Sequence, residues 1–154
     1  MYRNFLFLIY LFFVPVLYAD VSFENLTNTV KENFPSRYYG LAITDINNDR
    51  NFDLIVSNFE GANFYYTKKD NFYIKNHINP IINEKTIGVA ACDIDEDGYE
   101  EVYFLNTDTF GGLKRSNDNL IDYDRKKYID ILSLEENLEQ RNYYAGRSVG
   151  CIDK

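Results

Sequence analysis

The sequence of residues 88–106, GVAACDIDEDGYEEVYFLN, places an acidic loop between two apolar segments. Residues 40–58, GLAITDINNDRNFDLIVSN, align with it without a gap at an offset of 48 residues. A third copy begins with SVGCID at residues 148–153, which follow the second copy at an offset of 60 residues. Because a fixed period of this size is typical of repeat proteins, the chain is predicted to consist of similar structural units.

Each unit has the pattern of β structure. An apolar run precedes the acidic loop, a second apolar run follows it, and alternating aromatic residues such as those of 63–66 come next. Units of this length with about four strands are typical of propeller blades. The predicted fold class is therefore all-β, as a partial β-propeller with two four-stranded blades and the first strand of a third.

One segment departs from the β pattern. Between Tyr128 and Gln140, the residues Ile131, Leu134 and Leu138 recur at helical spacing, which predicts a short helix inserted between the second and third blades. The second unit also has eight extra residues around 110–117 when Asn63 is aligned with Asn119. The predicted domains are a signal peptide at 1–19, a lead segment at 20–37, blade 1 at 38–86, blade 2 with its helical insert at 87–145, and the start of a third blade at 146–154.

The N-terminus has the layout of a secretory signal. Arg3 precedes an apolar run at residues 5–17, and Tyr18, Ala19 and Asp20 follow it, so cleavage is predicted after Ala19. The run has 13 residues, whereas a membrane-spanning helix needs about 20. We therefore expect a secreted product with no membrane span after cleavage. The alternative is an uncleaved signal anchor.

The charge of the chain argues against nucleic acid as a partner. The net charge is −8, and loss of Arg3 with the signal leaves 24 acidic against 15 basic residues. The basic clusters at 68–69 and 125–127 are short and are flanked by Asp70 and Asp124. A protein that neutralises phosphates carries a basic patch instead, so these clusters are interpreted as solvated turns. The many aromatic and aliphatic residues argue against intrinsic disorder.

Two cysteines, Cys92 and Cys151, are too few for a small disulfide scaffold. Each lies in an apolar stretch that is predicted to be a strand, so both are predicted to be buried free thiols. A disulfide between them in an oxidising compartment is the alternative. Asn25, Leu26 and Thr27 form a glycosylation acceptor triplet, and behind a signal peptide it predicts a glycan on Asn25.

The acidic loops have the ligand pattern of a calcium site. Oxygen-bearing side chains occupy the first, third, fifth and ninth positions, and a hard cation such as Ca²⁺ takes six to eight oxygen ligands. Gly98 supplies a sharp turn in the second loop, whereas Arg50 stands at that position in the first, which predicts weaker binding there. Acidic surface turns without a metal are the alternative. The predicted ligands are Asp45, Asn47, Asp49, Asp53, Asp93, Asp95, Asp97 and Glu101, with the backbone carbonyls of Asn51 and Tyr99 at the seventh position.

An EF-hand begins with the same spacing but is excluded. It needs a bidentate glutamate at the twelfth position and a helix on each side. The twelfth position here is Val56 or Phe104, inside an apolar run that is predicted to be a strand.

Loops of the form D-x-D-x-D-G-x-x-[DE] between two strands resemble the calcium loops of FG-GAP and VCBS repeats, which occur in integrin α chains and secreted propellers. The resemblance extends from about Tyr38 to the end of the chain, and residues 88–106, 130–135 and 144–153 are most similar to secreted extracellular-matrix members of the family. It implies a seven-bladed propeller followed by a C-terminal module and an EGF-like calcium module. Because this sequence stops within the third unit, we expect a truncated gene product, a splice form or a fragment, with open strand edges.

The predicted function is that of a secreted, non-catalytic calcium-binding module of the extracellular matrix or of cell adhesion, with a matrix or cell-surface protein as its partner. One alternative is a fragment of a propeller enzyme, a hydrolase or lyase. His77, the only histidine, lies in a predicted loop, and no Ser/His or Cys/His arrangement accompanies it. The other alternative is an integrin-α-like receptor. A receptor predicts a membrane span, and no such apolar run follows Asp20.

Overall fold

The computed structural model describes residues 21–32, 34–79, 84–124 and 127–151. The predicted signal peptide at 1–19 and the last residues of the third unit, 152–154, lie outside this part of the chain. Within the described residues, no helix has the length and apolar character needed to cross a bilayer.

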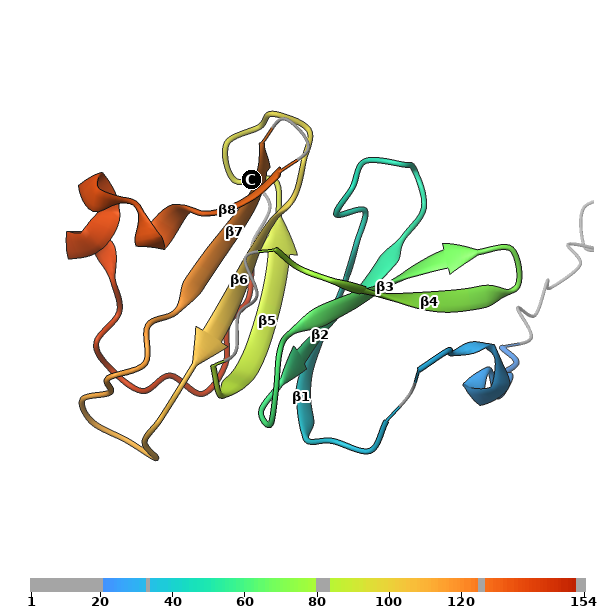
Figure 1. The fold of residues 1–154 in the computed structure, drawn as a ribbon, viewed down its shortest axis with the longest axis horizontal. Coiled ribbons are helices and arrows are strands. Elements are labelled where there is room, and N and C mark those ends of the chain that lie inside the picture. Colours follow the sequence, from blue (N-terminus) through green and yellow to red (C-terminus); the bar gives the residue numbers. More distant parts are fainter. Residues whose placement is uncertain (1–20, 33, 80–83, 125–126, 152–154) are drawn as a thin grey trace, which may run out of the picture.

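The fold consists of two four-stranded antiparallel sheets (Figure 1). In each sheet every strand pairs with the next one along the chain, so each unit is a simple meander. The prediction of two four-stranded units is confirmed. The strands of the first sheet are β1 (Tyr38–Thr44), β2 (Asp53–Asn58), β3 (Phe64–Lys69) and β4 (Phe72–His77), and those of the second are β5 (Thr86–Cys92), β6 (Glu101–Asn106), β7 (Asn119–Asp124) and β8 (Lys127–Asp130).

Strand register shows how the two units correspond. Val56 of β2 pairs with Phe64 of β3, and in the second sheet Phe104 of β6 pairs with Asn119 of β7. The offset between the units therefore rises from 48 residues at Val56 and Phe104 to 55 at Phe64 and Asn119. The insertion has seven residues, so the expected eight, from an alignment of Asn63 with Asn119, is wrong by one.

The structural counterpart of Asn63 is Asp118. The Asn63 side chain accepts a hydrogen bond from the backbone N–H of Asn58 at 2.8 Å, and Asp118 accepts the same bond from Asn106 at 2.7 Å. Both residues satisfy the amide at the end of the second strand. The sequence alignment failed because it matched residue identity, whereas the fold retains the hydrogen-bonding role.

The main hydrophobic core lies between the two sheets, where β1 and β2 face β5 (Figure 1). The inner strands approach closely at their first glycines. A Cβ atom placed on Gly40 would lie 3.2 Å from the Cα of Gly88 and 3.0 Å from the backbone nitrogen of Val89. Close backbone approach is a role that only glycine fills. The core residues are Ile46, Ile55, Ile78, Val89, Val102, Phe104 and Ile121.

A second cluster joins the lead segment to blade 1. Val30, which follows the short 3₁₀ helix η1 (Thr27–Thr29), forms a parallel bridge with Tyr73, and the Lys31 N–H donates to the Tyr73 carbonyl at 3.0 Å. Val30 packs with Val56, Phe64 and Tyr66. By register, these three residues correspond to Phe104, Asn119 and Ile121 of blade 2. In blade 2, Phe104 and Ile121 lie on the face that packs against blade 1. The lead segment covers the equivalent face of blade 1.

The predicted helix begins later than expected and is not an α-helix. Residues 127–130 form β8, so Tyr128 is part of a strand, paired with Tyr123. Two short 3₁₀ helices follow, η2 (Ile131–Ser133) and η3 (Glu135–Gln140). The apolar residues at helical spacing predicted a helix here, but pairing with β7 takes the first residues into the sheet.

The prediction of two buried free thiols is wrong. Cys92 and Cys151 form a disulfide with a Cα–Cα distance of 6.1 Å, and Cys151 is exposed. Residues 148–151 run beside β5, and Val149 lies 3.5 Å from the position of a Cβ on Gly88. Val149 of the third unit therefore lies next to Gly88 of the second unit, just as Val89 of the second unit lies next to Gly40 of the first. The first strand predicted there is not present among the described residues 148–151.

Candidate metal-binding loops

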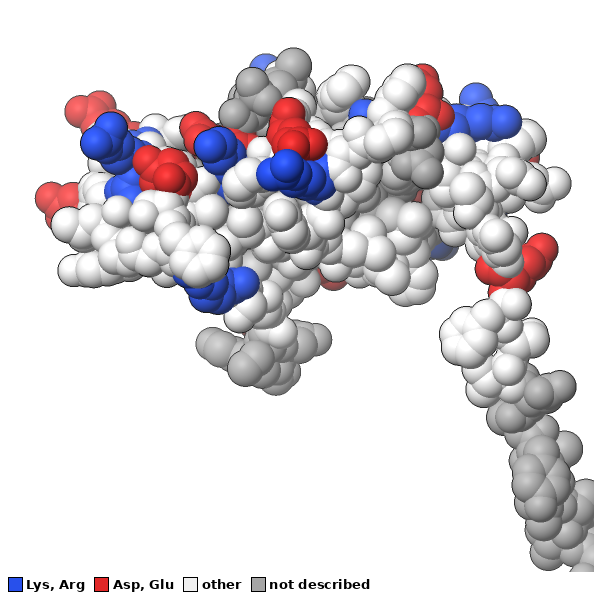
Figure 2. Space-filling view, turned by 90° about the horizontal axis from the view of Figure 1, so that it is seen from below, with Lys and Arg blue, Asp and Glu red and all other residues white. Residues whose placement is uncertain are grey.

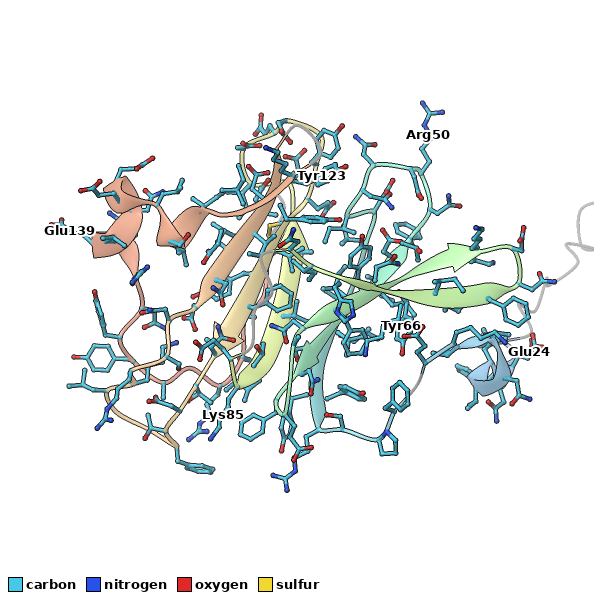
Figure 3. The ribbon with its side chains drawn as sticks, viewed as in Figure 1. Glu24, Arg50, Tyr66, Lys85, Tyr123 and Glu139 are labelled. Carbon is cyan, nitrogen blue, oxygen red and sulfur yellow. A yellow bond between two sulfur atoms is a disulfide. The ribbon has the colours of Figure 1, made fainter. Side chains whose placement is uncertain are left out.

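The two acidic loops lie at the same end of the molecule. The first loop (45–53) joins β1 to β2, and the second loop (93–101) joins β5 to β6. Both are at the top in Figure 1, and Figure 3 shows Arg50 at the tip of the first loop. The antiparallel meander produces this placement, because every first-to-second strand connection emerges at one end of its sheet.

The backbone follows the same path in both loops. The fourth residues, Asn48 and Glu96, have φ values of 55° and 63°, and the sixth residues, Arg50 and Gly98, have φ values of 69° and 91°. Left-handed backbone at alternate positions turns the intervening side chains toward one centre. Gly98 adopts this conformation without steric cost, whereas Arg50 is strained in it.

The aspartate at the first position organises each loop. Asp45 accepts hydrogen bonds from the backbone amides of Asp49 at 2.8 Å and Arg50 at 2.6 Å. In the second loop Asp93 accepts the equivalent bonds from Asp97 at 3.1 Å and Gly98 at 3.0 Å.

The third and fifth positions repeat the match. Asn47 and Asp95 each accept a hydrogen bond from the residue two positions later, at 3.0 and 3.1 Å. Asp49 and Asp97 do the same, at 2.9 and 2.8 Å. These bonds shape the loop and leave further lone pairs on each oxygen for a cation.

The ninth position carries a buried carboxylate in both loops. Asp53 is 0% exposed and Glu101 is 2% exposed. Neither carboxylate oxygen of Asp53 accepts a hydrogen bond of good geometry from a described residue, and one oxygen of Glu101 is likewise without a donor. Burial, followed by the nearby charges of Asp49 and Asp45, raises the pKa of Asp53 to about 7, and the backbone amide of Ile46, which is near but outside good hydrogen-bond geometry, lowers it by a smaller amount. Burial also raises the pKa of Glu101, although its second oxygen accepts a hydrogen bond from the Ile94 amide at 2.5 Å.

In the second loop, ligand atoms converge. Oxygen atoms of Asp93, Asp95 and Glu101 lie within 4.8 Å of one another. This is the only group of three or more acidic, histidine or cysteine ligands that comes together among the described residues. In the first loop Asn47 replaces an acid, and its three acids, Asp45, Asp49 and Asp53, form no such group.

A hydrogen bond joins the two loops. The side-chain amide of Asn48 donates to the backbone carbonyl of Gly98 at 3.0 Å. The loops therefore contact each other directly through the fourth position of one and the sixth position of the other.

Two other predicted residues lie away from the loops. Asn25 is exposed, and its side-chain oxygen accepts hydrogen bonds from the backbone amide of Thr27 at 3.0 Å and from its hydroxyl at 2.6 Å. His77 is the last residue of β4 and is exposed, so its prediction as a loop residue is wrong.

Sequence reasoning missed a buried polar network at the opposite end of blade 2. Lys114, in the inserted loop, forms an ion pair with Asp118, and both side chains are 0% exposed. Asp118 also accepts from the Tyr103 hydroxyl at 2.7 Å and from Asn142 at 3.1 Å. The Lys114 ammonium donates to the Asn106 carbonyl at 2.8 Å. The only sequence signal was the insertion itself, which supplies the lysine.

A chain of buried amide and hydroxyl groups continues from this network into blade 1. Asn63 donates to Thr86 at 2.8 Å, and Thr86 donates to Asn106 at 2.6 Å. Asn106 in turn donates to Asn119 at 2.6 Å. Since buried polar groups are costly unless they are paired, this chain ties the ends of the strands of both blades together.

Comparison with known proteins supplies the family. An FG-GAP-like repeat model matches residues 23–104. The chain is 39% identical over 160 residues to cartilage acidic protein 1 of Xenopus tropicalis, and this alignment covers 88% of the chain and 24% of the relative. It is 35% identical over 173 residues to the Homo sapiens protein of the same name, an alignment that covers 96% of the chain and 26% of the relative. The Mus musculus protein is 33% identical over 159 residues, and its alignment covers 88% of the chain and 24% of the relative.

The resemblance that residues 88–106, 130–135 and 144–153 indicate is confirmed, since these relatives are similar over about nine tenths of the chain. The chain spans about a quarter of the length of the curated relatives it matches.

Proposed function

The chain belongs to the FG-GAP-like repeat family, and on this premise we propose that it is a secreted, non-catalytic calcium-binding module of the extracellular matrix or of cell adhesion. The similarity to cartilage acidic protein 1 from three species supports the matrix assignment. The predicted signal at residues 1–19 supports secretion. The proposed partner is a matrix or cell-surface protein.

The observation that carries the calcium proposal is the pair of buried carboxylates at the ninth position, Asp53 and Glu101. A buried charge without a partner costs several kcal/mol unless it is neutralised or coordinates a metal. Two equivalent loops bury a carboxylate at the same position, beside further acids, and in each of them at least one oxygen has no hydrogen-bond donor of good geometry among the described residues. A cation bound in each loop would offset the cost of burying the ninth-position carboxylate and the repulsion between that carboxylate and the neighbouring acids.

The donor set fits a hard cation. In the second loop the side chains of Asp93, Asp95, Asp97 and Glu101, with the carbonyl of Tyr99, offer oxygen alone. The first loop offers Asp45, Asn47, Asp49 and Asp53, with the carbonyl of Asn51. Oxygen ligands in flexible, high-coordination loops are typical of calcium. At a dissociation constant of ~0.1 mM, ~1 mM calcium would stabilise the fold by about 1.4 kcal/mol per site.

Bound calcium has a structural role in this proposal. It would hold the turn between the two innermost strands of each blade, next to the Asn48 to Gly98 hydrogen bond that joins the loops. The acids at the first, third, fifth and ninth positions then serve as ligands or as acceptors of backbone hydrogen bonds, which supports a non-catalytic role.

The test is a calorimetric calcium titration of the full chain and of two variants of the second loop. Glu101→Gln removes the buried ligand charge, and we expect calcium affinity at this site to fall at least tenfold. Glu96→Gln is the matched control, because it removes the same charge from an exposed residue of the same loop that is not a candidate ligand. Equal effects of the two variants, or no calcium binding by the unmodified chain, would overturn the proposal.

The convergence of Asp93, Asp95 and Glu101 also ranks the loops. We expect tighter binding in the second loop, so Asp95→Ala should reduce total calcium binding more than Asp49→Ala. Equal losses would contradict the ranking but leave the calcium proposal itself standing.

A further inference from the structure

A pocket of about 580 Å³ opens at the end of the sheets away from the acidic loops. Lys85, one of its residues, lies at the lower end of the molecule in Figure 3, opposite Arg50. The pocket lies where the start of β1, the start of β5 and the loops after β2 and β6 meet. Its volume is in the range of small-molecule sites.

The walls of the pocket are mainly aromatic and apolar. Tyr39 and Phe59 form an edge-to-face pair with ring centroids 5.4 Å apart, and Ile87 and Phe110 complete the apolar lining. The backbone beside these residues is fixed, since the Thr107 amide donates to the Lys85 carbonyl at 3.0 Å. Figure 2 shows this end of the molecule as a largely uncharged surface with most of its charged side chains along one margin.

Two cations line the same pocket. The Lys85 ammonium is 5.7 Å from the centre of the Phe59 ring, and the Arg147 guanidinium carbon is 4.1 Å from the centre of the Phe110 ring. Among the described residues, neither cation has a carboxylate within 4.0 Å. Asp108, which also lines the pocket, accepts a hydrogen bond from the Arg115 amide at 3.0 Å.

The chain has a net charge of −8, yet two basic groups share this one pocket. Each lies near an aromatic ring and not near a carboxylate, an arrangement that Lys31 and Lys75 also have elsewhere in the chain. Aromatic rings orient a cation without neutralising it. The positive charge is therefore left available to a ligand.

We propose that this pocket binds an organic carboxylate that carries a flat ring. The ring packs between Tyr39, Phe59 and Phe110, and the carboxylate pairs with Arg147 and Lys85. Arginine recognises a carboxylate through two parallel hydrogen bonds, which also fixes the orientation of the ring. The site is separate from the acidic loops and does not depend on calcium.

The test compares two probes of nearly the same shape, one with a carboxylate and one with a neutral amide. Indole-3-acetate and the neutral indole-3-acetamide are titrated into the full chain by calorimetry at low and at physiological ionic strength. We expect the acid to bind at least tenfold more tightly than the amide and its affinity to fall with salt. No binding of the acid, or equal affinities for acid and amide, would overturn the proposal.

Two variants test whether Arg147 supplies the positive charge that binds the carboxylate. Arg147→Gln should weaken binding of the acid at least fivefold and leave that of the amide unchanged. Lys69→Gln, which removes an exposed cation from the β3–β4 hairpin, is the matched control and should have no effect. A melting temperature measured for each variant shows that the fold is intact, as expected for exposed side chains. Equal losses in the two variants would contradict the assignment.

Discussion

Arg50 and Gly98 occupy the same position of the two acidic loops and share a left-handed backbone, with φ values of 69° and 91°. The sequence shows only that arginine replaces glycine, whereas the structure shows that the loop keeps its shape regardless. The strain is therefore borne by Arg50.

Relief of this strain should be measurable. A left-handed residue with a Cβ costs about 1–2 kcal/mol, and glycine costs about 0.5–1 kcal/mol in lost chain entropy. We expect Arg50→Gly to raise the free energy of unfolding by about 0.5 kcal/mol in calcium-free buffer, as measured by urea denaturation. Arg50→Ala removes the same charge but keeps the Cβ and should show no gain. If both variants gained equally, charge and not backbone strain would be the cause.

The contact between Gly40 and Gly88 predicts a packing defect. A Cβ on Gly40 would lie 2.8 Å from the Ser57 hydroxyl and 3.0 Å from the Val89 nitrogen, so the two blades would have to move apart. We expect Gly40→Ala to destabilise the chain by about 1–3 kcal/mol in thermal denaturation. Gly111→Ala is the control, because a Cβ there meets nothing within 4 Å. A neutral Gly40→Ala would show that the blades are not packed this closely.

The disulfide between Cys92 and Cys151 spans 59 residues of sequence. Constraint of the unfolded chain by a loop of this size stabilises a protein by about 2–4 kcal/mol. We expect Cys151→Ser to lower the melting temperature by several degrees. Dithiothreitol should lower that of the unmodified chain to a similar extent and leave the variant unchanged. An unmodified chain insensitive to the reductant would contradict the pairing.

The raised pKa of Asp53 makes the calcium-free protein sensitive to pH. The folded pKa is about 7 and the ordinary value is 3.8, so the folded state binds more protons between these limits. Stability should therefore fall as the pH rises from about 4 to about 7, by a few kcal/mol in total. Melting curves in a chelator at pH 5 and pH 8 check the direction.

Variants isolate the contribution of Asp53 to this pH dependence. Asp53→Asn should flatten it, whereas Asp70→Asn, an exposed change in the β3–β4 turn, should not. Calcium added at pH 8 should restore the lost stability of the unmodified chain. A chelated protein that is more stable at pH 8 than at pH 5 would contradict the assignment.

Exposure of Asn25 predicts its modification. In cells that secrete through the endoplasmic reticulum, we expect mass spectrometry of the secreted chain to show Asp20 as the first residue and a glycan on Asn25. Thr27→Ala should abolish the glycan, and Thr27→Ser, which keeps the acceptor triplet, should retain it. Secreted material that retains residues 1–19 would contradict the cleavage prediction.

Much of the fold could be predicted from the sequence because its signals are local. The repeat of 48 residues, the alternating apolar segments and the turn-forming acids fix strands and loops through neighbours only a few residues apart. The candidate ligand positions belong to this class, since their spacing is a local pattern. In the second loop the structure brings Asp93, Asp95 and Glu101 together, whereas Asp97 and the acids of the first loop do not join such a group.

Other features could not be predicted because they depend on what the fold brings together. Ile46 and Ile94 hold the same place in the repeat, yet Ile46 is 1% exposed and Ile94 is 58% exposed. Ile46 packs against blade 2, and no described residue covers Ile94 in the same way. Burial depends on neighbours distant in sequence, which a local pattern does not contain.

The sequence alone thus determined the repeat, the strands and the two acidic loops, since hydrophobic periodicity and turn chemistry act over a few residues. Only the tertiary structure decided that Cys92 pairs with Cys151, that Lys114 is buried against Asp118, and that Lys85 and Arg147 line one pocket. Each of these facts is a distance between segments that the chain brings together when the blades pack. These distances depend on how the whole core packs, and not on the sequence around the paired residues.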